Sequence, residues 1–427
     1  MRKGTQRMPG ARAAGLAVAK KAARSPPAGN PMVLPSISWS CSVQEQALTH
    51  IFKYYVGTNT SRGIISYVSN SLNMGSSEAL QSIITAIAAE EYGKALRATN
   101  KDLQDAVLAK SDSTLTTVIM LALYEIISCH ESDVVNGWLN HVRGSVKLLE
   151  LRGPQQLESP IGLELFTLVR FQMAMSNLFF RTNAYTSPTL LSLSKLARTH
   201  CDGDLQAVED FYDILLSLNE LSIMVKKAYK THGFHGDTAP LLGEALRLDA
   251  ELALWEVSLG PAWQYTIAHN APSFSNGSTP FPSHNIEYYV YPSLDIAMYW
   301  NHYRQARIVL LAMVRAMCSR MSEAQEMPEL QQVQLESIAV HRRLVNDVCA
   351  SVPYYFIAEE AYFGGVARLP WPLFVAAECA DPDEYTRNWI TQILGIIGTS
   401  AGMQQAYLLS GLLQQGDHSW HLIPGKV

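Results

Sequence analysis

A nearly continuous apolar run covers residues 115–127, where Glu125 is the only charged side chain. A helix that is apolar on every side is buried on every side, and spanning a bilayer needs a longer run, of roughly 20 apolar residues. A second helix is predicted after a polar break at residues 130–133, because apolar residues recur there at helical spacing until Gly153 and Pro154 end the pattern. The pattern therefore predicts a buried helical hairpin around which the other helices pack.

From residue 42 onward the helical period continues and strand-like alternation is nearly absent. Further helices are predicted at residues 44–56, 77–96, 161–180, 204–225, 239–259, 294–318, 336–352, 384–397 and 402–415. No self-similar period of 20–50 residues appears, so a regular solenoid is not expected. The predicted fold is all-α, a large irregular multi-helix bundle.

Proline marks the expected ends and breaks of these helices. Pro353 is expected to stop the helix that begins near residue 336, and Pro372 suits the first turn of a helix after a rigid elbow at residues 369–372. Residues 261–288 interrupt the helical pattern with several prolines and an Asn-Gly-Ser turn, which predicts a long loop.

The N-terminal residues 1–40 differ from the rest in composition. Seven Lys and Arg residues precede the first acidic residue, Glu45, and prolines follow them, which predicts a disordered basic arm. Nuclear import, contact with DNA phosphates and an organelle transit peptide are alternative roles for this arm. The predicted division of the chain is an arm at 1–40, a helical domain at 41–416 and a tail at 417–427.

Composition narrows the function. The chain of 427 residues is 48% hydrophobic and 17% charged, so most of it should fold, and its net charge of −5 argues against binding nucleic acid through the bulk of the surface. No segment resembles a membrane span or a secretory leader. The six cysteines contain no CxxC pair, so we expect thiols of a reducing compartment and no bound zinc or other cofactor.

Several short strings occur together in an order that is similar to a known family. Leu123-Tyr124-Glu125 comes first, and strings at residues 303–308, 349–354 and 371–376 follow the central hairpin. Together they resemble the fungal-specific transcription factor domain, the regulatory region of fungal zinc binuclear cluster activators. The matching fold signature comprises Tyr124, Glu125, Trp138, His141, Gly144, Arg152, Gly153, Pro154, Arg304, Arg307, Trp371 and Pro372.

The resemblance implies a nuclear regulator of transcription, with the cytoplasm as the alternative location, that controls a metabolic or secondary-metabolite pathway. It also implies regulation through a small-molecule effector, other transcription factors or a second copy of the chain. The family's zinc cluster is missing from this sequence. Either the chain is a truncated regulator or gene model, or it acts through partners, and DNA is expected to be contacted only indirectly or through the basic arm. A helical interaction scaffold unrelated to transcription is the alternative.

No catalytic motif is present, and we expect no catalytic residues. Phosphate-binding glycine loops, H-E-x-x-H and G-x-S-x-G are absent. A helical enzyme of the terpene-synthase kind would need an aspartate-rich motif and an Asn/Ser/Glu metal triad, but Ala350 and Tyr354 stand at two of the triad positions after Asn346. A helical enzyme of unknown type is therefore the least favoured alternative.

Arginines inside apolar helices are the remaining candidates for chemistry. A buried guanidinium must be paired, and Glu125 or Glu164 is expected to supply the carboxylate. The alternative is an anionic effector bound in a pocket of His141, Arg170, Tyr299, Trp300 and Arg304. The aromatic residues from 288 to 303 either line such a cavity or fill the core, and His141 either faces the pocket or hydrogen-bonds to a neighbouring helix.

Overall fold

The computed structural model describes residues 92–128, 136–180, 187–201, 203–232, 238–269, 284, 287–324, 328–357, 363–380 and 382–415. They all lie within one compact unit, residues 42–427. The basic arm, the tail, the predicted helix at 44–56 and most of the one at 77–96 lie outside the described residues.

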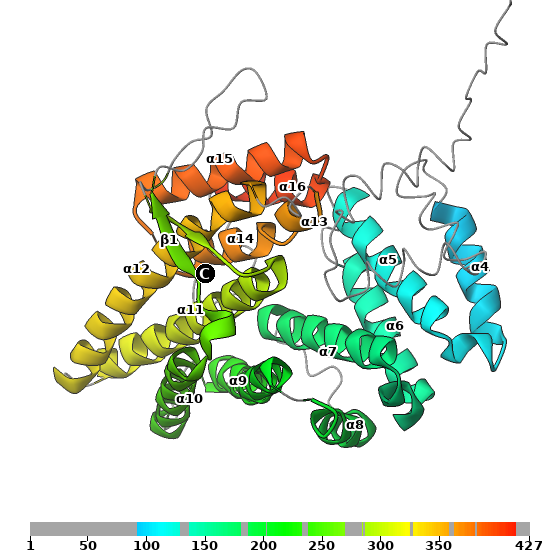
Figure 1. Ribbon diagram of the computed structural model, residues 1–427. Coiled ribbons are helices and arrows are strands. Elements are labelled where there is room, and N and C mark those ends of the chain that lie inside the picture. Colours follow the sequence, from blue (N-terminus) through cyan, green and yellow to red (C-terminus); the bar gives the residue numbers. More distant parts are fainter. Residues whose placement is uncertain are drawn as a thin grey trace, which may run out of the picture. The chain divides into compact units, whose positions relative to one another are not determined.

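The described residues confirm the all-α prediction (Figure 1). In chain order the longer elements are α4 (Tyr92–Gln104), α5 (Asp112–Ser128), α6 (Asn136–Arg152), α7 (Pro160–Phe180), α8 (Pro188–Arg198), α9 (Asp204–His232), α10 (Ala239–Ser258), β1 (Thr266–His269), β2 (Glu287–Val290), α11 (Leu294–Ala324), α12 (Pro328–Ile357), α13 (Phe363–Val366), α14 (Pro370–Cys379), α15 (Glu384–Ser400) and α16 (Gln404–Gln415). Short 3₁₀ turns connect some of them, at Leu108–Lys110, Pro154–Glu158 and Pro261–Trp263.

The larger hydrophobic core surrounds α11, which packs against α9, α10, α12 and α14. Residues 303–314 of α11 are all buried. The predicted hairpin exists as α5 and α6, but it organises a second, smaller cluster with α7 and α8. The expectation that the hairpin is the centre of the bundle is therefore wrong, because Arg304 and Arg307 make the central helix α11 look less apolar than α5.

Residues 261–288 are not wholly loop, in contrast to the prediction. Strands β1 and β2 pair antiparallel, with Thr266 opposite Val290 and His269 opposite Glu287. Four-residue strands are too short for alternation to be visible in the sequence. Aromatic contacts fasten this ribbon to the helices, since Tyr265 lies edge-on to Trp300 of α11 with ring centroids 5.2 Å apart.

Proline and short segments account for the other differences. Helix α12 continues through Pro353 to Ile357, so the predicted stop at Pro353 is wrong. Tyr354 and Tyr355 after it are buried, and that packing outweighs the loss of a backbone hydrogen bond. Helix α8 was not predicted; its Ser187 N-cap accepts a hydrogen bond from Leu190 N at 3.1 Å.

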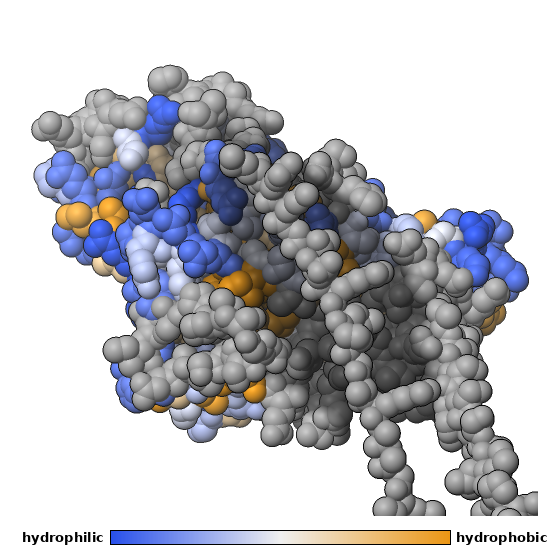
Figure 2. All heavy atoms as spheres, turned by 90° about the horizontal axis from the view of Figure 1, so that it is seen from above, coloured by the Kyte–Doolittle hydropathy of each residue, from blue (hydrophilic) through white to orange (hydrophobic). Residues whose placement is uncertain are grey.

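Figure 2 shows the molecule from above. On this face, hydrophilic side chains cover much of the described surface, with apolar ones in smaller groups between them. Among the described residues, no helix combines the length and the apolarity needed to cross a membrane.

Helices α15 and α16 approach each other closely at Gly398. A Cβ atom there would lie 2.8 Å from Tyr407 Cβ and 2.9 Å from Tyr407 N. We therefore expect Gly398→Ala to lower the free energy of unfolding by about 1–3 kcal/mol, because a helix must shift to relieve the overlap. Gly411→Ala on α16 is the matched control: nothing lies within 4 Å of its Cβ, so higher helix propensity should raise stability. Urea unfolding measures both, and equal effects of the two variants would contradict the packing argument.

Candidate functional site

The α5–α6 hairpin contains a small polar cluster. Tyr92 stacks on Tyr124, with ring centroids 4.4 Å apart, and its hydroxyl donates to Glu125 Oε1. The same hydroxyl lies 3.1 Å from His141 Nε2, and His141 Nε2 is 3.6 Å from Glu125 Oε1. Burial lowers the pKa of His141 although Glu125 opposes this shift. His141 thus hydrogen-bonds to a neighbouring helix, and Glu125 is engaged here and not with an arginine.

The end of α6 is fastened to the start of α5. Arg152 is buried, donates from Nη1 to Ser111 O at 3.0 Å and pairs with Asp112. Gly153 has φ of 69°, a conformation that favours glycine, and Pro154 opens the following 3₁₀ turn. These contacts hold the two helices of the hairpin together.

Arg170 of α7 forms a buried ion pair with Glu209 of α9. The side chains are 1% and 3% exposed. The guanidinium lies between two rings, with Cζ 4.7 Å from the centroid of Phe166 and 4.3 Å from that of Tyr212. Burial raises the pKa of Tyr212 to about 12, so its hydroxyl stays neutral. The pair therefore crosslinks α7 and α9 where water does not reach.

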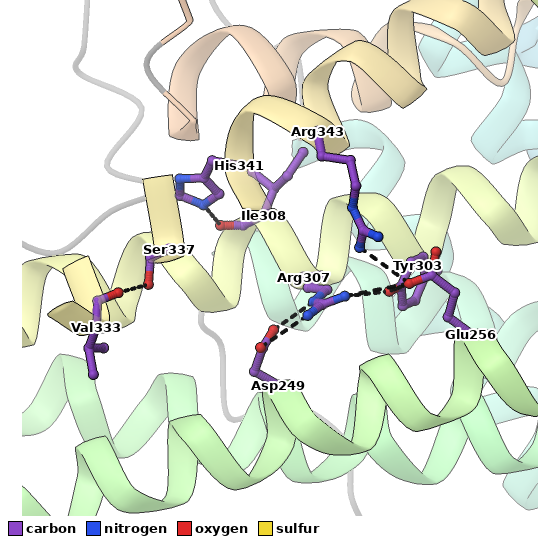
Figure 3. Close-up of polar contacts among 9 residues, drawn as sticks. All are labelled: Asp249, Glu256, Tyr303, Arg307, Ile308, Val333, Ser337, His341 and Arg343. Atoms are coloured by element: carbon purple, nitrogen blue, oxygen red, sulfur yellow. Dashed lines mark hydrogen bonds and ion pairs between the residues drawn. The ribbon is translucent and has the colours of Figure 1, made fainter. Parts of the chain in front are cut away.

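Arg307 of α11 anchors a second polar network, drawn in Figure 3. Its Nε and Nη2 donate to the two oxygens of Asp249 on α10, at 2.6 and 3.1 Å. Its Nη1 donates to the Tyr303 hydroxyl at 2.8 Å, and that hydroxyl donates to Glu256 at 2.6 Å. Arg343 of α12 reaches the same Glu256 at 3.3 Å, so one network joins α10, α11 and α12.

His341 belongs to α12, and its ring contacts α11 at Ile308, next to Arg307 (Figure 3). Its Nε2 is 3.0 Å from Ile308 O, and its Nδ1 is 3.3 Å from an Arg315 nitrogen. A neutral ring with the proton on Nε2 satisfies both contacts. Burial lowers the pKa of His341 to about 4, which keeps the ring neutral at pH 7.

This histidine makes the stability depend on pH. Its pKa is about 4 in the folded chain and about 6.5 in an unfolded one, so the unfolded chain binds more protons between these values. Stability should therefore fall as the pH drops from 6.5 towards 4, by up to about 1.4 kcal/mol per pH unit from this residue. His341→Gln keeps a donor for Ile308 O and should flatten the slope by that amount. Urea unfolding from pH 7.5 to 4.5 tests this, and an unchanged slope would assign the acid sensitivity to other groups.

Arg304 differs from the arginines above in its surroundings. It is 1% exposed, and its Nη1 donates at 2.8 Å both to the Tyr291 hydroxyl and to Asn301 Oδ1. Its Cζ lies between 5.4 and 5.9 Å from four ring centroids, those of Tyr265, Tyr289, Tyr291 and Trp300. The ribbon β1–β2 and α11 thus build an aromatic enclosure around the guanidinium.

A family model for the fungal-specific transcription factor domain matches residues 62–408, which is most of the chain. This chain belongs to that family. An uncharacterized protein of Emericella nidulans is 34% identical over 79 residues, which are 18% of this chain and 16% of that protein. The match thus spans less than a fifth of that relative's length. No solved structure matches.

The family signature falls into both cores of this transcription factor domain. Trp138 and Gly144 lie in the hairpin, where a Cβ atom added at Gly144 would lie 3.8 Å from Val118 Cγ1. Trp371 stacks on Phe179 with ring centroids 5.6 Å apart. Pro372 lies in the first turn of α14, as predicted. Within the described part of the chain, no group of three or more His, Cys, Asp or Glu side chains is arranged to hold a metal ion.

The five residues proposed for an effector pocket do not converge on one place. Trp300 and Arg304 lie together, whereas Tyr299 contacts Phe171 edge-on at 5.3 Å. Arg170 pairs with Glu209, and His141 lies in the hairpin cluster. The aromatic segment from 288 to 303 is divided between the core and the enclosure. Two further residues at this place had no local indication in the sequence. Tyr265 is one of the rings around Arg304, and Asp347 accepts a hydrogen bond from Tyr289.

Proposed function

We propose that this chain regulates transcription through its helical domain, in the nucleus, and that its targets are genes of a metabolic pathway. The match of the family model to residues 62–408 carries the proposal. The domain contains two hydrophobic clusters, which contact each other through α5, α7, α11 and α16. An effector or a partner that prefers one arrangement of the two clusters would shift the population towards it.

We further propose that this chain is recruited to DNA through a partner, either another transcription factor or a second copy of the chain. The six cysteines have no CxxC spacing, and the net charge of −5 gives no general affinity for phosphates. The basic arm, with seven cations in residues 1–30, is the part suited to nuclear import or to auxiliary phosphate contacts.

A tethering experiment tests the regulatory role. The chain fused to a heterologous DNA-binding domain should change the expression of a reporter by about tenfold, the effect of a population shift worth 1.4 kcal/mol. The DNA-binding domain alone is the baseline, and a fusion carrying the exposed substitution Arg247→Met should behave like the parent. A well-folded fusion without effect on the reporter would contradict a regulatory role.

Gel-shift and localisation experiments test the other parts of the proposal. The purified chain should show no sequence-specific shift of DNA, and tight specific binding by the chain alone would contradict partner-mediated recruitment. A fluorescent fusion should enter the nucleus, and replacing the seven cations of the arm by glutamine should reduce that entry if the arm directs it.

A further inference from the structure

Among the described residues, no carboxylate forms a direct ion pair with the guanidinium of Arg304, and Asp347 acts on it only from a longer distance. Four arginines are buried among the described residues: Arg152, Arg170, Arg304 and Arg307. Three of them contact a carboxylate directly. No Asp or Glu oxygen of the described residues lies within 4 Å of the fourth, Arg304. Because burying an unpaired charge is costly, this arrangement requires an explanation.

One edge of the Arg304 guanidinium has no acceptor. Its Nη1 is used by Tyr291 and Asn301, but Nε and Nη2 have no hydrogen-bond partner in the described structure. Arg307, one turn away on α11, uses the same two nitrogens to bind both oxygens of Asp249 (Figure 3). That edge has the geometry for a bidentate carboxylate, so Arg304 offers one half of a salt bridge for which the described residues supply no other half.

The surroundings of this edge specify the rest of the ligand. Tyr265, Tyr289 and Trp300 present flat rings within 6 Å of Arg304 Cζ. The Tyr289 hydroxyl donates to Asp347 Oδ1 at 2.7 Å, so this carboxylate of α12 already has a hydrogen-bond partner, and it makes no direct ion pair with Arg304. Flat apolar walls with one cationic edge select a planar apolar body that carries one carboxylate.

We propose that the Nε–Nη2 edge of Arg304 anchors a small planar carboxylic acid, of which benzoate is the simplest aromatic member, between the ribbon β1–β2 and α11. The inference rests on the proposed function, for which this ligand is the effector. Because Arg304 is 1% exposed, the acid enters only when the rings of the ribbon move aside. Binding therefore depends on the position of the ribbon against α11, and the ligand stabilises one such position over others.

The test compares benzoate with benzamide, an uncharged molecule of nearly the same shape, by calorimetric titration of the purified full chain. Benzoate should bind saturably with a Kd of about 1 mM or tighter. Benzamide should bind at least about tenfold more weakly, since it lacks the charge that faces the guanidinium. Failure of benzoate to bind at about 10 mM, or equal binding of benzamide, would overturn the proposal.

Two variants locate the site. Arg304→Lys keeps the charge but loses the two-nitrogen edge, so benzoate should bind at least about tenfold more weakly. Arg247→Lys, an exposed arginine on α10, should leave binding unchanged. Undiminished binding by a folded Arg304→Lys chain would overturn the assignment, and if that variant does not fold, the benzoate–benzamide pair decides. Binding is measured without DNA, so a chain that binds benzoate but leaves the reporter unaffected contradicts the regulatory role and not the site.

Discussion

Replacement of Arg170 by methionine is expected to lower the free energy of unfolding by about 3–5 kcal/mol. The substitution keeps much of the apolar stem but leaves Glu209, whose side chain is 3% exposed, without its partner. Removing one member of a buried ion pair strands the other charge in a medium that solvates it poorly. The loss of the cation between the rings of Phe166 and Tyr212 adds to the effect.

Urea unfolding followed by circular dichroism measures this change, with Arg247→Met as the matched control. Arg247 makes ion pairs with Glu244 and Glu251 on the surface of α10, where its side chain is 48% exposed, so its loss should cost no more than about 1 kcal/mol. The double substitution Arg170→Met with Glu209→Leu should recover much of the loss, because no charge stays buried. A cost equal to that of the control would show that water reaches the α7–α9 interface.

The hydrophobic period alone predicted the all-α class and most helices, because amphipathic spacing is a local property. It placed the hairpin correctly, yet it identified the wrong centre. The run at 115–127 contains one charge, whereas the fully buried residues 303–314 contain two arginines and a glutamine. Burial of charged side chains depends on partners from other helices, so a hydrophobicity pattern underrates such a helix.

The ion-pair partners of the buried arginines could not be predicted from the sequence for the same reason. Arg170 meets Glu209, which is 39 positions away, and Arg307 meets Asp249, which is 58 positions away. Glu125 and Glu164 are the partners expected from the sequence, but Glu125 instead contacts Tyr92 and His141. The enclosure around Arg304 depends on a ribbon of two four-residue strands that show no alternation, so the sequence indicated only its aromatic composition.

Two arginines one helical turn apart should respond to very different extents to the same substitution. Arg307→Met should lower the free energy of unfolding by about 2–4 kcal/mol, since it leaves Asp249 unpaired; the 22% exposure of that side chain keeps the cost below that of Arg170. Arg304→Met should change stability by no more than about 1 kcal/mol. It removes two hydrogen bonds and the contacts with rings, but it also removes a buried charge that no carboxylate of the described residues neutralises.

Thermal and urea unfolding of both variants, without added ligand, measures this difference. A residue whose charge contributes little to the stability of the free chain, yet is buried among aromatic rings, is expected where binding and not folding needs the charge. A loss at Arg304 as large as that at Arg307 would mean that the aromatic rings alone compensate the guanidinium, which would make the enclosure a structural clasp between the ribbon and α11. A small loss at Arg304, together with a benzoate-induced rise in Tm that only the parent chain shows, leaves the ligand as the missing counter-charge.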